Sequence, residues 1–166
     1  HDIGKPKALR REKKKIIFHG HERIGLGLTR IISRRLKLSN DESRRLERIV
    51  LWHLRPGYLA DNPHPTARAI FRYFRDTGND ALAVLLLSLA DQRATKGPLT
   101  TADSHRRHEK VVKALIRKLL KKNNEKKIVR FLNGNDLMAK FRLPASPLIG
   151  ELLTELEEAQ AIGKIK

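Results

Sequence analysis

The sequence predicts an all-α fold, and three observations support this prediction. Apolar residues recur at spacings of three and four in several segments, which is the pattern of an amphipathic helix. No segment sustains the two-residue alternation of a half-buried strand. Capping residues and Pro or Gly breaks separate the helical segments. We therefore expect a multi-helix bundle over residues 1–97, followed by a basic helix and a smaller helical tail domain over residues 98–166.

The first long helix is predicted from His21 along a single apolar stripe. The stripe consists of His21, Ile24, Leu28, Ile31 or Ile32, and Leu36. Residues 39–42 are then typical of an N-terminal cap with acidic residues in the first turn. The helix that follows carries Leu46, Ile49, Val50 and His53 on one face, and we expect it to stop at residues 55–57. Residues 7–15 lack apolar periodicity, and we interpret them as a solvated basic loop.

Two further helices are predicted before residue 97. The first carries Ala67, Ile70, Phe71 and Phe74 and breaks at residues 77–79. The second, from Ala81 to about Arg93, is apolar nearly all round, which is typical of a helix at the centre of a bundle. In the tail, we expect Asp136 to cap a short helix that starts at Leu137. A last amphipathic helix is expected from Ile149 to about Ala161.

The composition narrows the classes of function and of partner. The chain has 36 Lys and Arg against 18 Asp and Glu, a net charge of +18, so nucleic acid is the first partner to consider. An anionic membrane surface and plain solubility are the alternatives. There is no cysteine, which excludes disulfides, a thiolate nucleophile and Cys-ligated zinc. The longest apolar run, residues 81–87, is far short of the ~20 residues that span a bilayer, so we expect a cytoplasmic protein without a membrane partner.

A predicted helix over residues 104–122 concentrates the positive charge. Residues 103–130 hold 11 basic and 3 acidic residues, whereas the last 36 residues hold 4 basic and 5 acidic ones. Its apolar face consists of Val111, Val112, Leu115, Ile116, Leu119 and Leu120. Its other faces carry Arg106, Arg107, Lys110, Lys113, Arg117, Lys118, Lys121 and Lys122. Phosphate contacts need such cations in register along a groove, and the alternative interpretation is a solvated face of a bundle.

A second group of residues is typical of metal ligands. His1 and Asp2 are adjacent, and His21, His53 and Asp91 each lie on or beside an apolar stripe. Imidazole nitrogens and carboxylate oxygens together suit a divalent cation. Taken singly, each His is more often a hydrogen-bonded core residue, and Asp91 could pair with Arg93 or cap a helix. Only the conjunction of the five residues indicates a metal site.

Four motifs in order resemble the HD superfamily. They occupy residues 1–6 (HDIGKP), 18–22 (FHGHE), 53–56 (HLRP) and 89–91 (LAD). More narrowly, they are similar to the HD domain of bacterial CCA-adding and A-adding nucleotidyltransferases and poly(A) polymerases. The resemblance implies metal ligands at His1, Asp2, His21, His53 and Asp91, with His21 rather than His19 as the ligand. It also implies a divalent cation such as Mg²⁺, Mn²⁺, Ni²⁺ or Co²⁺.

The tail resembles the C-terminal tRNA-binding domain of the same family. The similarity follows FLNGNDLM at residues 131–138, PLIG at residues 147–150 and the last helix, and it implies RNA contacts at Asn133 and Asn135. Because the sequence opens inside a motif, we interpret it as part of a longer protein. The family's polymerising site, with its Asp-x-Asp motif, does not occur in it, so the resemblance implies a separate N-terminal nucleotidyltransferase domain as a partner.

The sequence therefore predicts the tRNA-binding C-terminal part of a protein that synthesises or repairs tRNA 3′ ends. Two alternatives remain open. One is a metal-dependent phosphohydrolase that cleaves phosphomonoesters or cyclic phosphodiesters at the HD site. The other is a structural basic spacer, whose RNA binding would be weak and insensitive to neutralising the cations of helix 104–122.

Overall fold

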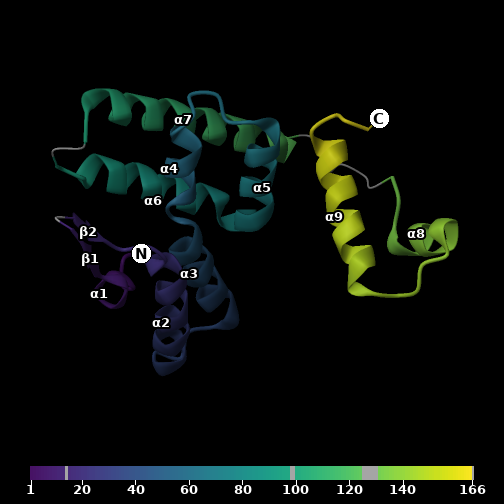
Figure 1. Cartoon of the computed structure of the whole chain (residues 1–166), viewed down its shortest axis with the longest axis horizontal. Helices are drawn as coiled ribbons and strands as arrows, with labels where there is room; N and C mark the ends of the chain where they lie inside the picture. Colours follow the sequence, from purple (N-terminus) through teal and green to yellow (C-terminus); the bar gives the residue numbers. More distant parts are fainter. Residues whose placement is uncertain (14, 98–99, 125–130, 166) are drawn as a thin grey trace.

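The computed structural model describes residues 1–13, 15–97, 100–124 and 131–165, with the side chains of residues 122–124 excepted. Its helices and strands, in chain order, are α1 (Lys5–Ala8), β1 (Arg10–Glu12), β2 (Lys15–Ile17), α2 (His21–Arg35), α3 (Asn40–Trp52), α4 (Arg55–Ala60), α5 (Ala67–Thr77), the 3₁₀ turn η1 (Gly78–Asp80), α6 (Ala81–Ala94), α7 (Ala102–Asn124), α8 (Gly134–Phe141) and α9 (Pro147–Ala161). The all-α prediction is confirmed, with one small antiparallel hairpin added (Figure 1).

The hairpin corrects the interpretation of residues 7–15 as a loop. Residues 5–8 form a single helical turn, and β1 pairs with β2 in the register Arg10↔Ile17, Arg11↔Ile16 and Glu12↔Lys15. Strands of three residues are too short to show a two-residue period in the sequence. Among the described residues of the turn, Lys13 has a φ of +55°, which allows the chain to reverse.

Helices α2 and α3 form an antiparallel hairpin (Figure 1), and their contact surface differs from the predicted stripe. The buried face of α2 carries His21, Gly25, Thr29 and Ser33, whereas much of the predicted stripe is exposed. The exposed members are Ile31, Ile32 and Leu36. A Cβ on Gly25 would lie 2.9 Å from Cγ1 of Val50 in α3, so the two helices approach too closely for large side chains. Hydropathy alone does not reveal such a small-residue face.

The start of α3 follows the prediction, and its end does not. The Ser39 hydroxyl accepts a hydrogen bond from the backbone N–H of Glu42, and the Glu42 carboxylate accepts one from the backbone N–H of Ser39. This reciprocal cap fixes the first turn of the helix. After Trp52 the chain does not leave helical structure at Pro56, because α4 begins at Arg55. Proline is tolerated in a first turn, where its missing N–H has no intrahelical partner. Leu46, which was predicted to face inward, is exposed.

The hydrophobic core lies between α4, α5, α6 and α7. Its fully buried members include Tyr73, Val84, Leu85 and Val112, and the Tyr73 hydroxyl donates to the carbonyl of Ala81 at 2.7 Å. Helices α6 and α7 run side by side along most of their length (Figure 1). The core therefore continues past residue 97 into α7 and does not end where we expected a domain boundary.

Two predicted faces are corrected by this packing. Leu82 and Leu86 are exposed, so α6 is covered on one side and is not surrounded by the bundle. On α7, Leu120 is exposed although it was predicted to face inward, while Val111, Val112 and Leu115 are buried as expected. Helix α7 packs against α4 and α6 on one side only. Leu120 lies at the edge of that side, where neither helix covers it.

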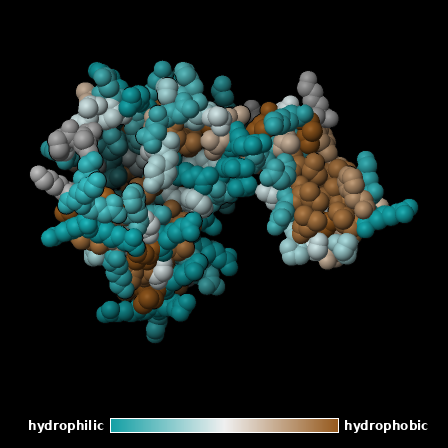
Figure 2. All heavy atoms as spheres, in the orientation of Figure 1, coloured by the Kyte–Doolittle hydropathy of each residue, from teal (hydrophilic) through white to brown (hydrophobic). Residues whose placement is uncertain are grey.

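The tail consists of α8 and α9, which pack against each other. Asn133, not Asp136, caps α8, and Asp136 completes a reciprocal cap by accepting from the backbone N–H of Asn133. Figure 2 shows a hydrophobic face over this part of the molecule. The exposed large apolar residues of the tail include Phe131, Phe141 and Leu148. Helix α9 contacts α5 of the bundle.

A buried carboxylate joins the tail to the bundle. Glu158 in α9 is 2% exposed, and it accepts hydrogen bonds from the guanidinium of Arg72 at 2.7 and 3.2 Å. Arg68 lies 2.6 Å from the same carboxylate, and Arg75 lies 4.0 Å away. The Arg72 hydrogen bond, reinforced by the charges of Arg72, Arg68 and Arg75, holds the pKa of Glu158 below its ordinary value.

Candidate metal centre and basic face

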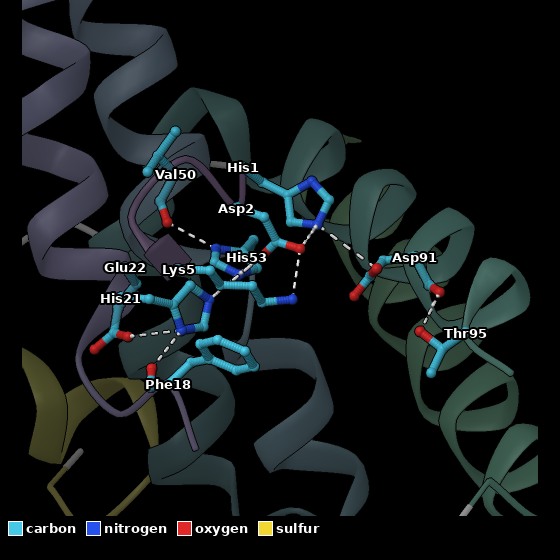
Figure 3. Close-up of polar contacts among 10 residues, drawn as sticks. All are labelled: His1, Asp2, Lys5, Phe18, His21, Glu22, Val50, His53, Asp91 and Thr95. Carbon is cyan, nitrogen blue, oxygen red and sulfur yellow. Dashed lines mark hydrogen bonds and ion pairs between the residues drawn. The ribbon is translucent and has the colours of Figure 1, made fainter. Parts of the chain in front are cut away.

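The five residues predicted as metal ligands lie together, although they come from four separate parts of the chain (Figure 3). His1 and Asp2 precede α1, His21 is the first residue of α2, His53 ends α3, and Asp91 lies near the end of α6. We call these five residues the histidine–aspartate cluster. One ligand atom from each of His1, Asp2 and His53 lies within 4.8 Å of the other two.

The carboxylate of Asp2 is the centre of this cluster. Its Oδ1 lies 3.4 Å from Nε2 of His21 and 3.7 Å from Nε2 of His53. Its Oδ2 lies 3.3 Å from Nε2 of His1. Nε2 of His1 in turn lies 3.6 Å from Oδ1 of Asp91. The adjacent His1-Asp2 pair therefore connects the two other histidines to the distant aspartate.

Backbone carbonyls fix the tautomers of two of the histidines. Nδ1 of His21 donates to the carbonyl of Phe18 at 2.8 Å, and Nδ1 of His53 donates to the carbonyl of Val50 at 2.7 Å. Since a carbonyl oxygen only accepts, each neutral ring carries its proton on Nδ1 and presents an unprotonated Nε2. These two Nε2 atoms lie 3.1 Å apart. This distance suits either a single proton shared between the two nitrogens or a cation bound by both.

The spacing of these atoms is compatible with the ligands of a divalent cation, and burial bears on the charge of one of the histidines. Burial lowers the pKa of His53, and the charge of His21 lowers it further, although the Val50 carbonyl and Asp2 oppose this. Two ligand atoms bound at about 2.1 Å and at right angles around one ion lie about 3.0 Å apart, close to the spacings in this cluster. Nε2 of His1 is buried and has no hydrogen-bond partner among the described residues, so it is also free to bind a cation.

Lys5 belongs to the site and was not singled out from the sequence. Its Nζ lies 2.6 Å from Oδ2 of Asp2 and 5.8 Å from the centre of the Phe18 ring. The signal was its position three residues after Asp2, since the backbone turn closed by the Lys5 N–H and the Asp2 carbonyl brings the two residues together. The Asp2 and Asp91 side chains are 36% and 42% exposed, so the cluster is open to solvent on the side of these carboxylates.

The structure also separates the competing interpretations of individual residues. His19 is exposed and makes no contact with the cluster within the part of the chain that is described. Asp91 does not pair with Arg93, because the Arg93 guanidinium donates to Glu109 of α7 at 3.1 Å. His108 is a core histidine of the ordinary kind, and its Nε2 lies 2.9 Å from the hydroxyl of Ser88.

The cations of α7 lie opposite its buried side. The exposed cations that the structure describes are Arg106, Arg107, Lys110, Lys113, Arg117, Lys118 and Lys121, and we call this surface the basic face. The side chain of Lys122 lies outside the described residues. Within the described chain, Arg106 pairs with Asp103 and Lys113 pairs with Glu109, while Arg107, Lys110 and Arg117 make no ion pair. A groove of about 260 Å³ is lined by Arg106, Glu109, Lys110, Lys113 and Arg117.

The two asparagines of the tail are both exposed, and the structure gives one of them a local role. Oδ1 of Asn133 accepts from the backbone N–H groups of Asn135 and Asp136 at 2.8 and 3.1 Å. This is the hydrogen bonding of a helix cap. RNA contacts by Asn133 and Asn135 stay a prediction.

Comparison with known proteins places the chain beside one enzyme. It is 31% identical over 168 residues to the A-adding tRNA nucleotidyltransferase of Deinococcus radiodurans. The chain is related to a tRNA nucleotidyltransferase. The similarity covers 99% of this chain, so both the bundle and the tail lie within it, and the chain spans 37% of the length of that relative. No protein-family profile and no solved structure matched the chain. In the described ranges, none of the helices is both long and apolar enough to cross a membrane.

Proposed function

We propose that this chain is the RNA-binding C-terminal part of a protein that acts on tRNA 3′ ends, and that it carries an HD-type metal centre. The polymerising site would lie in another domain of the parent protein. The basic face of α7 would hold the body of a tRNA while that domain works on its end. The observation that carries the proposal is the basic face itself, supported by the relationship to a tRNA nucleotidyltransferase.

The position of the basic face supports this role. The buried side of α7 is part of the main hydrophobic core, so its cations are presented on a helix that is held rigidly. Five of them form no ion pair with a described carboxylate and can contact phosphates, namely Arg107, Lys110, Arg117, Lys118 and Lys121. Arg93 of α6 pairs with Glu109 in α7, which ties the two helices together at one edge of the basic face.

The metal centre is supported by the ligand geometry. We propose that His1, Asp2, His21, His53 and Asp91 surround one divalent cation, with Lys5 orienting Asp2 through its second carboxylate oxygen. The carbonyls of Phe18 and Val50 hold His21 and His53 in the metal-binding tautomer, the usual second layer of support around a metal. Mg²⁺, Mn²⁺, Ni²⁺ and Co²⁺ all accept this set of nitrogen and oxygen ligands.

The decisive experiment measures tRNA binding as a function of salt concentration. We expect log K to fall linearly with log salt, by about 0.7–0.9 per phosphate contact. A triple variant, Arg107→Gln, Lys110→Gln and Arg117→Gln, should therefore lower the slope by roughly 2–3. These three residues are exposed, so the variant should fold as the parent chain does.

A matched variant neutralises three cations away from α7. Arg34→Gln, Arg35→Gln and Arg44→Gln remove the same charge from exposed positions of α2 and α3. If tRNA binding depends on the basic face, the slope of log K against log salt should be nearly the same for this control as for the parent chain. Equal slopes for the parent chain and the α7 variant would contradict the proposal and support a structural basic spacer.

A second function is favoured by the open side of the histidine–aspartate cluster, where Asp2 and Asp91 are partly exposed beside Lys5. A bound cation would activate water and offset phosphate charge at such a site. Under this alternative, phosphate release from phosphomonoesters or cyclic phosphodiesters should depend on Mn²⁺, Ni²⁺, Co²⁺ or Mg²⁺ and should be lost in Asp2→Ala. Absence of metal-dependent release from the full-length parent would remove this alternative.

A further inference from the structure

A cleft of about 400 Å³ opens between the start of α2, the end of α3 and α4. Its volume falls in the ~300–1,000 Å³ range of small-ligand pockets. The residues that define its chemistry are Glu22, Arg23, Leu26, Trp52, Arg55 and Tyr58. None of the metal ligands or the cations of α7 lines it, so it is a separate feature of the molecule.

The cleft presents three flat groups: Tyr58, which is exposed, Trp52, which is partly buried against the core, and the guanidinium of Arg55. Tyr58 is 65% exposed, so its ring is accessible to a ligand in the cleft. The guanidinium of Arg55 lies 4.7 Å from the centre of the Trp52 ring, and Asp76 holds it there with a hydrogen bond of 2.7 Å. Aromatic rings and guanidinium planes of this kind are the surfaces on which unpaired bases stack.

The charges in the cleft favour a base over a bare phosphate. Arg23 and Arg55 supply positive charge to the cleft. Glu22 also lines the cleft, and its carboxylate would repel a small inorganic anion such as phosphate. Leu26 and the two aromatic rings make much of the remaining surface apolar. A nucleotide matches these groups. Its planar, largely uncharged base can contact Leu26 and the aromatic rings, and its phosphate can reach the arginines.

The cleft also lies next to the histidine–aspartate cluster along the chain. Glu22 and Arg23 directly follow His21, and Trp52 directly precedes His53. The Glu22 carboxylate lies 3.8 Å from Nδ1 of His21. Glu22 is therefore shared between the wall of the cleft and the surroundings of His21.

We propose that this cleft binds one unpaired nucleobase of an RNA strand, by stacking on Tyr58 and on the Arg55–Trp52 pair. The proposal rests on RNA being the partner, as proposed above, and adds a contact to an unpaired base. It does not require extensive stacking, since the chain has only 5% aromatic residues.

The test uses Trp52, because it is the single tryptophan of the chain. Stacking of a base close to this ring should quench its fluorescence. We expect AMP to quench the emission with a saturable dependence on concentration, and ribose 5-phosphate at the same concentrations to leave it unchanged. Equal quenching by both compounds would show a phosphate site and overturn the proposal, as would no quenching by AMP.

Variants at exposed aromatic residues locate the binding site. Tyr58→Ala should weaken AMP binding about tenfold, within the range measured for single stacked bases, and Tyr58→Phe should restore it. Phe141→Ala is the matched control, because it removes a similarly exposed ring from the tail. Undiminished binding by Tyr58→Ala, or equal losses in Tyr58→Ala and Phe141→Ala, would overturn the assignment to this cleft.

The α7 triple variant separates this proposal from the proposed function. We expect it to bind tRNA with a lower salt slope while AMP still quenches Trp52 as in the parent chain. If AMP binding persists but the tRNA slope is unchanged, the base site stands and the role of the basic face fails. If the tRNA slope falls but AMP does not bind, the basic face stands and the base site fails.

Discussion

The histidine–aspartate cluster and the basic face are built in opposite ways. The cluster collects side chains from positions 1, 2, 21, 53 and 91, so it depends on how four separate parts of the chain are packed. The basic face lies on one continuous helix, whose periodicity alone gathers its cations. The cluster should therefore fail after a single change in packing, whereas the basic face should weaken in steps as charges are removed.

The largest effect is expected at the cluster itself. His21→Ala removes a buried histidine that contacts both Asp2 and His53 and that we propose as a ligand, and it should weaken Mn²⁺ binding by at least about 100-fold, as measured by calorimetry. His19→Ala is the matched control, since it removes an exposed histidine two residues away. Similar Mn²⁺ affinities in the two variants would contradict the assignment of His21 as a ligand.

A change in packing should break the cluster and spare the basic face. A Cβ on Gly4 would overlap the carbonyl oxygen of His21, so Gly4→Ala should push α1 and the adjoining His1-Asp2 pair away from α2. We expect a loss of about 1–3 kcal/mol in the free energy of unfolding and weaker Mn²⁺ binding, with an unchanged salt slope for tRNA.

Gly27→Ala is the control for this prediction. Gly27 lies in α2 with open space around its Cα, and alanine there should be neutral or slightly stabilising, by up to about 1 kcal/mol. If Gly4→Ala binds Mn²⁺ as the parent chain does, the cluster does not depend on close packing of α1 on α2.

The junction between bundle and tail should respond to pH. The Arg72 hydrogen bond and the nearby guanidinium charges lower the pKa of Glu158 from its ordinary value of 4.5. The carboxylate therefore stabilises the folded state above that ordinary value, and this contribution is lost as the pH falls through the lower pKa of the folded state.

Glu158→Gln should remove this dependence. Thermal unfolding followed from about pH 7 to about pH 3 should show a variant that is less stable than the parent near neutrality, with the difference shrinking in acid. A difference that stays constant across this range would mean that packing of the side chain, and not its charge, holds α9 against α5.

The smallest effect is expected at a helix cap remote from both sites. Ser39→Ala removes the hydroxyl that accepts from Glu42, and it should cost about 1 kcal/mol of stability in chemical denaturation. Ser146→Ala is a suitable control, because Ser146 occupies the cap position of α9 without making a cap hydrogen bond. Equal costs in the two variants would show that the α3 cap contributes no more than an ordinary surface serine.

Local features of the structure could be predicted from the sequence because their causes are local. Helix α3 begins where Ser39 and Glu42 predicted, and α5 ends at Gly78, which has a φ of +53°. The cations of α7 are exposed because its apolar residues define the opposite side by helical spacing alone. These outcomes need only propensities, caps and the 3.6-residue period.

The tertiary structure decided what depends on distances between elements. It placed Asp2 between three histidines, set the two Nε2 atoms of His21 and His53 face to face, and brought Lys5 onto Asp2. It also buried the small-residue side of α2 in place of the predicted apolar stripe, and extended the core into α7 across the expected boundary. Periodicity fixes the direction of a side chain around its own helix axis, but not which neighbour fills the space that it faces.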